Sequence, residues 1–173
     1  LARRMAKAGV AVIIGSRTAE RAQEAAQAIG NGARGMTNAD AAGAAGVVLV
    51  TVPWGNQAQI LDEIRAHVAG KLVIDTTVPL VPPKVARVQL PPEHSAALSA
   101  QKRLGADVRV VSAFHNVAAH KLATDETIDC DVLVFGDAPA DRDVAVALAK
   151  AAGLRGVHAG PLANSVAAEA LTS

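Results

Sequence analysis

Short runs of β-branched and other apolar residues recur along the chain, and stretches with helical spacing separate them. Two of these runs, Val10–Gly15 and Val47–Val52, are apolar almost throughout. Continuous apolar runs of this length are typical of strands that are buried on both faces of a parallel sheet. Strands that alternate with helices form βαβ units. The sequence therefore predicts an α/β protein with a doubly wound, mostly parallel sheet.

Capping residues and glycines set the other expected boundaries. Thr18 suits the cap of a helix over Ala19–Ile29, and Asn38 suits the cap of a short helix that ends near Ala45. Further strands are expected at Ala33–Thr37, Leu72–Asp75, Val108–Ala113, Val132–Phe135 and Gly156–Ala159. Further helices are expected at Leu1–Ala8, Trp54–Val68, Ser95–Leu104, Ala140–Ala152 and Leu162–Leu171.

The composition narrows the class of protein. Of the 173 residues 51% are hydrophobic and the net charge is +1, which argues against intrinsic disorder and against a nucleic-acid binder. A single cysteine, Cys130, excludes an internal disulfide, and the histidines lack metal-ligand spacing. No apolar run is long enough to span a membrane. We therefore expect one cytoplasmic domain that binds small molecules and no metal.

A phosphate-binding cluster is predicted where the first of these strands ends. Ser16 and Arg17 follow Gly15 there, and Arg21 lies four residues further on. In doubly wound nucleotide-binding folds an acidic residue at this place selects NAD, whereas an arginine accommodates the 2′-phosphate of NADP. The N-terminus of the helix after Thr18 adds positive dipole character. The alternative is an ordinary capped helix with solvated arginines.

The literal Gly-x-Gly-x-x-Gly sequence at Gly30–Gly35 is not interpreted as a phosphate-binding loop. Such a loop must leave a strand and begin a helix, so that the pyrophosphate meets the N–H groups of the helix. Here the glycines follow a predicted helix and enter a predicted strand. We interpret the segment as a helix end followed by a turn.

Three later strands end in residues that can contact a ligand. Their ends are Thr51–Trp54, Asp75–Pro79 and Phe114–Asn116. Open α/β sheets bind ligands at the carboxyl ends of their strands. Proline ends a strand and can present its backbone to a bound ring, although the prolines here could equally be simple strand terminators. The proline-rich connection 81–105 is either a stiff surface connection or a wall over this edge.

The ordered set of these motifs resembles the F420-dependent NADP reductase family, whose members exchange a hydride between NADP(H) and the deazaflavin coenzyme F420. The resemblance covers nearly the whole chain. It implies a single Rossmann-like NADP-binding domain over 1–173, in which the connection 81–105 and the C-terminal segment 153–173 contribute to the acceptor site. The segments that carry it are 1–9, 12–17, 52–54, 75–80, 94–97, 130–137, 153–155, 159–164 and 169–172.

The resemblance also implies which residues bind NADP(H). Ser16, Arg17 and Arg21 would hold the 2′-phosphate. Residues at the later strand ends would line the ribose and the nicotinamide. These lining residues are Thr51, Val52, Pro53, Trp54, Val78 and Pro79.

The two ring systems are expected to meet near the histidine segment. The resemblance implies that His115, as the catalytic residue, and Val117 position the rings, and that Thr172 contacts the deazaflavin. Ala170 stands where the family has serine. Hydride would pass directly between the stacked rings, so that the protein mainly binds and orients them.

The family begins with a strand and a glycine-rich turn, and both are missing from this chain, which starts at Leu1. That strand is central in the usual 3-2-1-4-5-6 order. We therefore expect a gap in the sheet and weak NADPH binding by these residues alone. Two alternatives stay open: an NADP-dependent reductase of another acceptor, such as an imine or a ferric complex, and a non-catalytic NADP(H)-binding sensor. A homodimer is one candidate for the oligomeric state.

Overall fold

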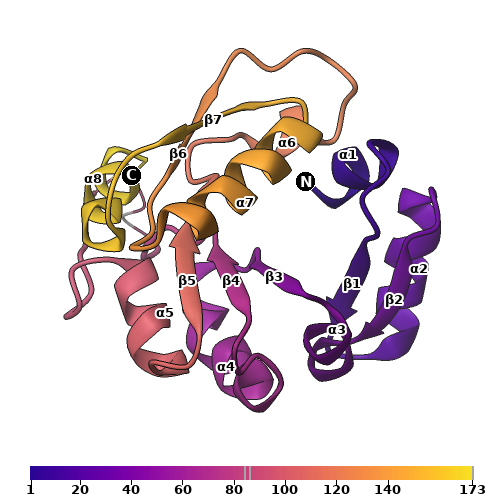
Figure 1. Ribbon diagram of the computed structural model, residues 1–173, viewed down its shortest axis with the longest axis horizontal. Coiled ribbons are helices and arrows are strands. Elements are labelled where there is room, and N and C mark those ends of the chain that lie inside the picture. Colours follow the sequence, from indigo (N-terminus) through magenta and orange to yellow (C-terminus); the bar gives the residue numbers. More distant parts are fainter. Residues whose placement is uncertain (84, 86, 173) are drawn as a thin grey trace.

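Strands and helices alternate along the whole chain in the computed structural model, which describes residues 1–83, 85 and 87–172 (Figure 1). This alternation confirms the predicted α/β class. The strands are β1 (Ile13–Ser16), β2 (Arg34–Thr37), β3 (Val47–Val50), β4 (Leu72–Asp75), β5 (Arg109–Ser112), β6 (Asp131–Val134) and β7 (Arg155–His158). The α-helices are α1 (Ala2–Lys7), α2 (Ala19–Ile29), α3 (Asn38–Ala44), α4 (Trp54–Ile64), α5 (Ala96–Leu104), α6 (Ala119–Leu122), α7 (Pro139–Ala151) and α8 (Ser165–Leu171).

Side-chain caps determine where two of these helices begin. Oγ1 of Thr18 accepts a hydrogen bond from the backbone N–H of Arg21, which confirms the predicted cap of α2. The prediction that Asn38 caps α3 is wrong. Thr37 is the cap, since its Oγ1 accepts from the backbone N–H of Asp40 at 3.2 Å. The cap residue must keep an extended backbone, and Thr37 does so while Asn38 is already helical.

Parallel pairing produces three ladders in the described part of the chain: β1–β2, β3–β4–β5 and β6–β7. An antiparallel bridge between Ser112 and Phe135 joins the end of β5 to the residue after β6, through two backbone hydrogen bonds of 2.8 and 2.9 Å. Among the described residues no ladder joins β1 to β3. The strand expected between them stays a prediction.

Helices cover both faces of the β3–β4–β5 ladder. All four residues of β4 are buried, and the side chains of Leu72, Val73 and Ile74 alternate between two core clusters. Ile74 packs on one face with Met5 of α1 and with α7, whereas Val73 packs on the other face with Leu61 of α4 and with α5. A parallel ladder that is covered in this way is the architecture expected for a doubly wound fold.

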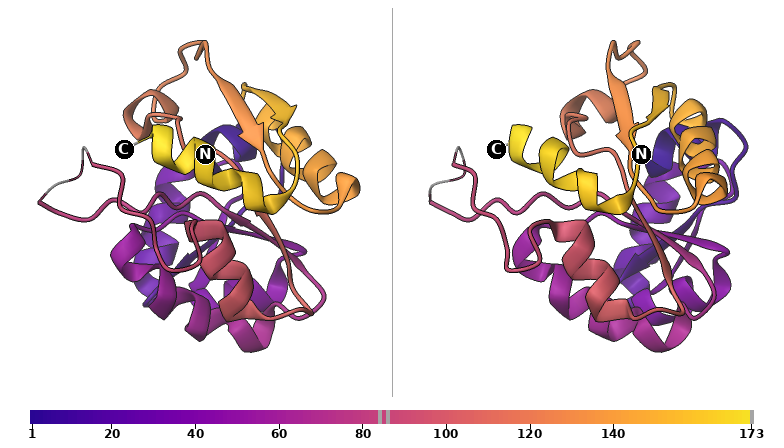
Figure 2. Two further views of the ribbon diagram at one scale, coloured as in Figure 1. Left: turned by 90° about the vertical axis from the view of Figure 1, so that its left-hand side faces the viewer. Right: turned by 60° about the vertical axis from the view of Figure 1, so that its left-hand side comes forward.

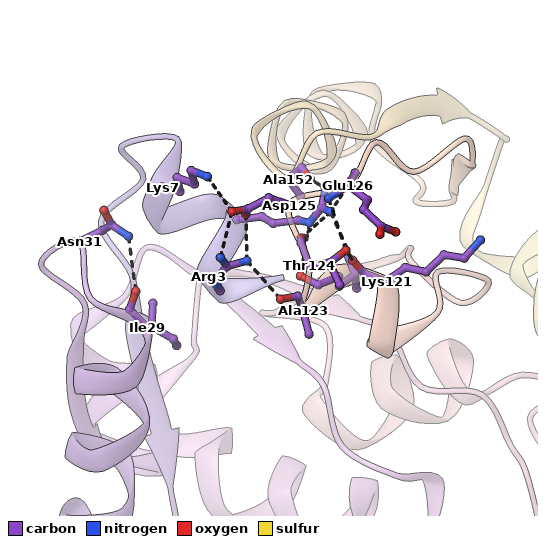
Figure 3. Close-up of polar contacts among 12 residues, drawn as sticks. Arg3, Lys7, Ile29, Asn31, Lys121, Ala123, Thr124, Asp125, Glu126 and Ala152 are labelled. Atoms are coloured by element: carbon purple, nitrogen blue, oxygen red, sulfur yellow. Dashed lines mark hydrogen bonds and ion pairs between the residues drawn. The ribbon is translucent and has the colours of Figure 1, made fainter.

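Arginine side chains fasten helix α1 to the loop that follows α6 (Figure 3). Arg3 and Lys7 both pair with Asp125, at 2.9 and 3.1 Å. Arg4 is half-buried, and within the described residues it donates hydrogen bonds only to backbone carbonyl groups. These carbonyls belong to Lys121, Leu122, Thr124, Glu126 and Ala152. A cation among the carbonyls at the ends of α6 and α7 is favourable, because those helix ends carry partial negative charge.

The Gly30–Gly35 segment connects α2 to β2, as its interpretation as a helix end and turn predicts. Gly30 ends α2 with a φ of 69°, a conformation that favours glycine. Gly35 lies in β2 directly against α2. A Cβ atom there would lie 2.2 Å from the carbonyl carbon of Ala22, so only glycine fits at this crossing.

The connection between β4 and α5 extends away from the body of the molecule as an arm (Figure 2). Pro79 and Pro91 are buried near its two ends. Between them Val85, Val88 and Leu90 are all more than 40% exposed. The arm is therefore anchored at both ends, while its middle presents apolar side chains to solvent.

Candidate functional site

A cavity of about 440 Å³ opens where β3 and β4 end. One wall consists of the residues that follow β3, namely Val52, Pro53, Trp54 and Gly55. The opposite wall follows β4 and continues into the arm, with Thr76, Thr77, Val78, Leu80, Pro82 and Val85. This volume lies within the range of roughly 300–1,000 Å³ that is typical of small-molecule sites. The largely apolar lining, with two threonines, suits a flat ring with polar substituents.

The cavity brings together four residues that the sequence analysis assigned to cofactor binding: Val52, Pro53, Trp54 and Val78. Two other assigned residues flank the cavity without lining it. Thr51 is exposed directly after β3, and Pro79 is buried beside Val78. Pro82 and Val85 belong to the proline-rich connection, so this connection forms part of a cavity wall.

The predicted phosphate cluster lies on the other ladder. Ser16 is half-buried at the end of β1, and Arg17 and Arg21 are exposed around the first turn of α2. Neither guanidinium group has an ion-pair partner among residues 1–83, 85 and 87–172. These residues lie near one another in the chain, at the end of β1 and the start of α2, and they are not part of the cavity lining.

His115 lies in the turn after β5 and is 8% exposed. Its Nε2 lies 2.6 Å from Oγ of Ser112, to which it is hydrogen-bonded, and its ring centroid lies 6.3 Å from that of Phe135. Burial lowers the pKa of His115 to about 4, because desolvation disfavours the charged imidazole. At neutral pH this side chain is therefore a neutral hydrogen-bonding group.

Two further predicted residues lie outside the cavity lining. Val117 is half-buried and packs against the core cluster that contains β5 and β6. Thr172 follows α8, and its Oγ1 donates a hydrogen bond to the carbonyl oxygen of Ala168 at 2.8 Å. The structure therefore does not bring His115, Val117 and Thr172 to the walls that contain Trp54.

A buried polar network that was not predicted from the sequence joins α4 to the end of β4. Oδ1 of Asp75 accepts hydrogen bonds from Oγ1 and the backbone N–H of Thr77, at 2.7 and 3.3 Å. Oδ2 of Asp75 accepts from Nε2 of Gln57 at 2.7 Å. Burial raises the pKa of Asp75 to about 6, although the hydrogen bonds oppose this effect. The position of Asp75 at the end of an apolar strand could have indicated a polar site in the sequence. Its partner Gln57 lies 18 positions away, so no local pattern connects the two residues.

A second buried carboxylate connects α8 to the start of α5. Glu169 accepts hydrogen bonds from the backbone N–H groups of Ala96 and Ala97, at 2.6 and 3.2 Å. Burial, helped by the charge of Asp75, raises the pKa of Glu169 to about 7. Glu169 begins the segment that the resemblance associates with the deazaflavin. In the structure its carboxylate caps a helix inside the protein.

Two classes of feature are absent from the described residues. Within residues 1–83, 85 and 87–172 no three His, Cys, Asp or Glu side chains gather closely enough to hold a metal ion. The helices in the same residues are too short or too polar to cross a membrane.

Solved structures share this fold. A protein from Arthrobacter sp. FB24, provisionally assigned as an F420-dependent NADP reductase, has a TM-score of 0.81 and 21% identity, over 97% of this chain and 82% of that chain. An imine reductase from Streptomyces aurantiacus has a TM-score of 0.60 and 20% identity, over 98% of this chain and 55% of that chain. The fold is therefore that of a Rossmann-like, doubly wound α/β protein.

Sequence comparison identifies the family. Residues 1–79 match the family model described as NADP oxidoreductase coenzyme F420-dependent. The F420-dependent NADP reductase of Methanothermobacter thermautotrophicus is 40% identical over 185 residues, which is 99% of this chain and 80% of the relative. The enzyme of the same name from Methanocaldococcus jannaschii is 34% identical over 99% of this chain and 82% of the relative. The chain belongs to the F420-dependent NADP reductase family.

Proposed function

We propose that the protein transfers a hydride between NADP(H) and coenzyme F420. The observation that carries this proposal is the 40% identity, over nearly the whole chain, to a relative named F420-dependent NADP reductase. When bound, the two cofactors supply the chemistry, in which a hydride passes between C4 of the nicotinamide and C5 of the deazaflavin. The contribution of the protein is to bind and orient the rings and to exclude water.

The residues of the cavity suit the nicotinamide end of NADP(H). Val52, Pro53 and Trp54 provide an apolar part of the lining, and Val78 adds to it from the segment after β4. Thr76 and Thr77 add polar atoms to the lining, although their hydroxyl and N–H groups donate to Val50 and Asp75, so toward a ring they can only accept hydrogen bonds. We infer that these residues hold the nicotinamide and its ribose, with Thr51 and Pro79 flanking them.

Ser16, Arg17 and Arg21 suit the 2′-phosphate of NADP(H). A guanidinium group without a protein partner is available for charge-assisted hydrogen bonds to a phosphate. We expect Arg17→Ala to weaken NADPH binding roughly 10- to 100-fold, since a hydrogen bond to a charged group contributes about 1.5–3 kcal/mol. NADH binding should hardly change.

The control for this variant is Arg34→Ala. Arg34 is also exposed and begins β2 beside Ile13, at the opposite end of the ladder from Ser16. Arg34→Ala should bind both dinucleotides like the wild type in a calorimetric titration. If Arg17→Ala instead weakens NADH and NADPH binding equally, Arg17 has a structural role and the phosphate site is wrong.

We further propose that His115 and Val117 orient the two rings and that Thr172 lies near the deazaflavin. A neutral, buried imidazole supports this role for His115, because such a group can hydrogen-bond to a ring without adding a charge. The test is the rate of hydride transfer in a single turnover with His115→Ala. An unchanged rate would remove His115 from the site.

The acceptor is tested with purified protein by following the absorbance of NADPH in the presence of F420, a cyclic imine or a ferric complex. We expect turnover with F420. Turnover with another acceptor alone would identify a different reductase, and tight NADPH binding without any turnover would identify a sensor. We also propose a cytoplasmic location, and light scattering of the purified protein decides whether it forms a homodimer.

A further inference from the structure

One buried side-chain hydrogen bond joins the two walls of the cavity from behind. Gln57 lies one turn after Trp54 in α4, and Asp75 is the last residue of β4. Nε2 of Gln57 donates to Oδ2 of Asp75 at 2.7 Å, and both residues are at most 2% exposed. The bond therefore ties the helix that carries one wall to the strand end that carries the other.

Further partners hold both ends of this bond in place. On one side, Oδ1 of Asp75 accepts from Oγ1 of Thr77 at 2.7 Å, and Thr77 lines the cavity. On the other side, Nε2 of Gln57 also donates to the carbonyl oxygen of Ala96 at 3.1 Å, and the N–H of Ala96 donates to Glu169. Because each of these groups is buried and partnered, neither side chain can rotate without leaving a buried polar group unsatisfied.

Among the described residues, no side chain caps the start of α4. Pro53 occupies the cap position and makes no side-chain hydrogen bond to the first turn. Most helices use a Ser, Thr, Asp or Asn cap to satisfy and orient their first N–H groups. In α4 the buried contact of Gln57 with Asp75 follows Trp54 by one turn.

We propose that Gln57 and Asp75 are positioning residues that set the separation of the cavity walls, and with it the affinity for the nicotinamide end of NADP(H). The identity of the ligand rests on the proposed function, whereas the geometry of the walls does not. Neither residue lines the described cavity. Gln57 acts through Trp54, and Asp75 acts through Thr77.

The chain provides its own probe of this geometry. Trp54 is the single tryptophan of the sequence, which has no tyrosine, so the intrinsic fluorescence reports on one cavity wall. The probe works without ligand, through quenching by acrylamide, and with ligand, through the loss of emission as NADPH binds. The first measurement tests the wall, and the second tests its effect on binding.

Four variants isolate the bond. Gln57→Met keeps the length of the side chain and removes the donor, and Gln57→Glu removes the donor and keeps the shape. Asp75→Asn leaves one acceptor oxygen, so that Gln57 and Thr77 can no longer both donate to this side chain. The double variant Gln57→Glu with Asp75→Asn reverses donor and acceptor and restores one bond between the walls. Gln59→Glu is the matched control, since Gln59 is exposed on the same helix and receives the same change of charge. Thermal unfolding selects the variants that fold.

We expect each of the three single variants to increase the quenching of Trp54 by acrylamide. Each should also raise the Kd for NADPH roughly tenfold or more, because each removes one partner of a buried hydrogen bond. The double variant should bind NADPH more tightly than either of its single variants. Gln59→Glu should match the wild type.

Two results would overturn the proposal. One is that Gln57→Met has the quenching and the NADPH affinity of the wild type, and the other is that the double variant binds NADPH no more tightly than Gln57→Glu. If Gln57→Glu does not fold, the quenching of Trp54 and the NADPH affinity of Gln57→Met decide the positioning role. If the wild-type protein does not bind NADPH, the proposed function fails, and the quenching of Trp54 in Gln57→Met still decides the positioning role.

Discussion

The neutral state of His115 makes the stability of the protein depend on pH in a way that one variant can isolate. Burial lowers the pKa of His115 from 6.5 to about 4, so the unfolded chain takes up a proton at a higher pH than the folded protein does. The unfolded state is therefore favoured as the pH falls. Replacing His115 with glutamine, which keeps a side-chain amide near Ser112 and does not titrate, removes this contribution.

The magnitude follows from the difference between the two pKa values. One pKa unit corresponds to 1.36 kcal/mol, so the fall from 6.5 to about 4 is worth about 3 kcal/mol. This stabilisation is fully present above pH 6.5 and is lost as the pH falls through about 4. Asp75 and Glu169 have raised pKa values and act in the opposite direction, lowering stability as the pH rises towards neutrality. Their contributions cancel in the difference between wild type and variant.

Urea unfolding of both proteins between pH 4 and pH 8 measures that difference. We expect the free energy of unfolding of the wild type to fall by about 3 kcal/mol relative to His115→Gln between pH 7 and pH 4. The exposed His120, changed to glutamine, is the control and should show a much smaller dependence. A difference that stays constant over this pH range would refute the claim that His115 is buried and neutral.

Two other perturbations test how the scaffold is held together. Gly35→Ala should lower the free energy of unfolding in urea by at least about 1–3 kcal/mol, because the new Cβ would overlap the backbone of α2. Gly46→Ala is the control and should change the free energy of unfolding little, since no atom lies within 4 Å of its Cβ position. Arg4→Met should lower stability by about 1–3 kcal/mol, since it leaves carbonyls at the ends of α6 and α7 without their partner. Arg3→Met, which removes an exposed ion pair, should cost less than about 1 kcal/mol, and equal effects of the two arginines would contradict the role given to Arg4.

The order of strands and helices was predictable because each element carries a local signal. The apolar run at Val47–Val52 and the cap at Thr18 needed no knowledge of the rest of the chain, and both predictions are confirmed, with β3 ending at Val50. Boundaries were less certain where two suitable residues are adjacent. Thr37 and Asn38 can both cap a helix, and only the backbone conformation at Thr37 decides between them.

Three of the predicted site residues follow directly from a strand end and lie together in the structure. Val52, Pro53 and Trp54 were assigned to the ligand side because they come after an apolar run, and the structure places them in one cavity wall. The polar network behind that wall could not be found in this way. Gln57 and Asp75 are 18 positions apart, and Glu169 lies 73 positions from Ala96. No local pattern relates such residues, since only the packing of α4, α5 and α8 brings them together.

The same distinction explains how the two parts of the expected NADP(H) site relate to each other. The proposed nicotinamide side follows β3 and β4, whose parallel ladder fixes Val50 beside Asp75 and so brings together the starts of the two cavity walls. The phosphate side is built on β1, which pairs with β2 in a separate ladder. Within each ladder backbone pairing fixes the strand ends from which the proposed binding residues follow. Between the ladders the alignment depends on the packing of α1 and α3, and on any strand that pairs with the edges of β1 and β3. The affinity for a whole dinucleotide should therefore respond to changes in that packing even where both sets of binding residues are intact.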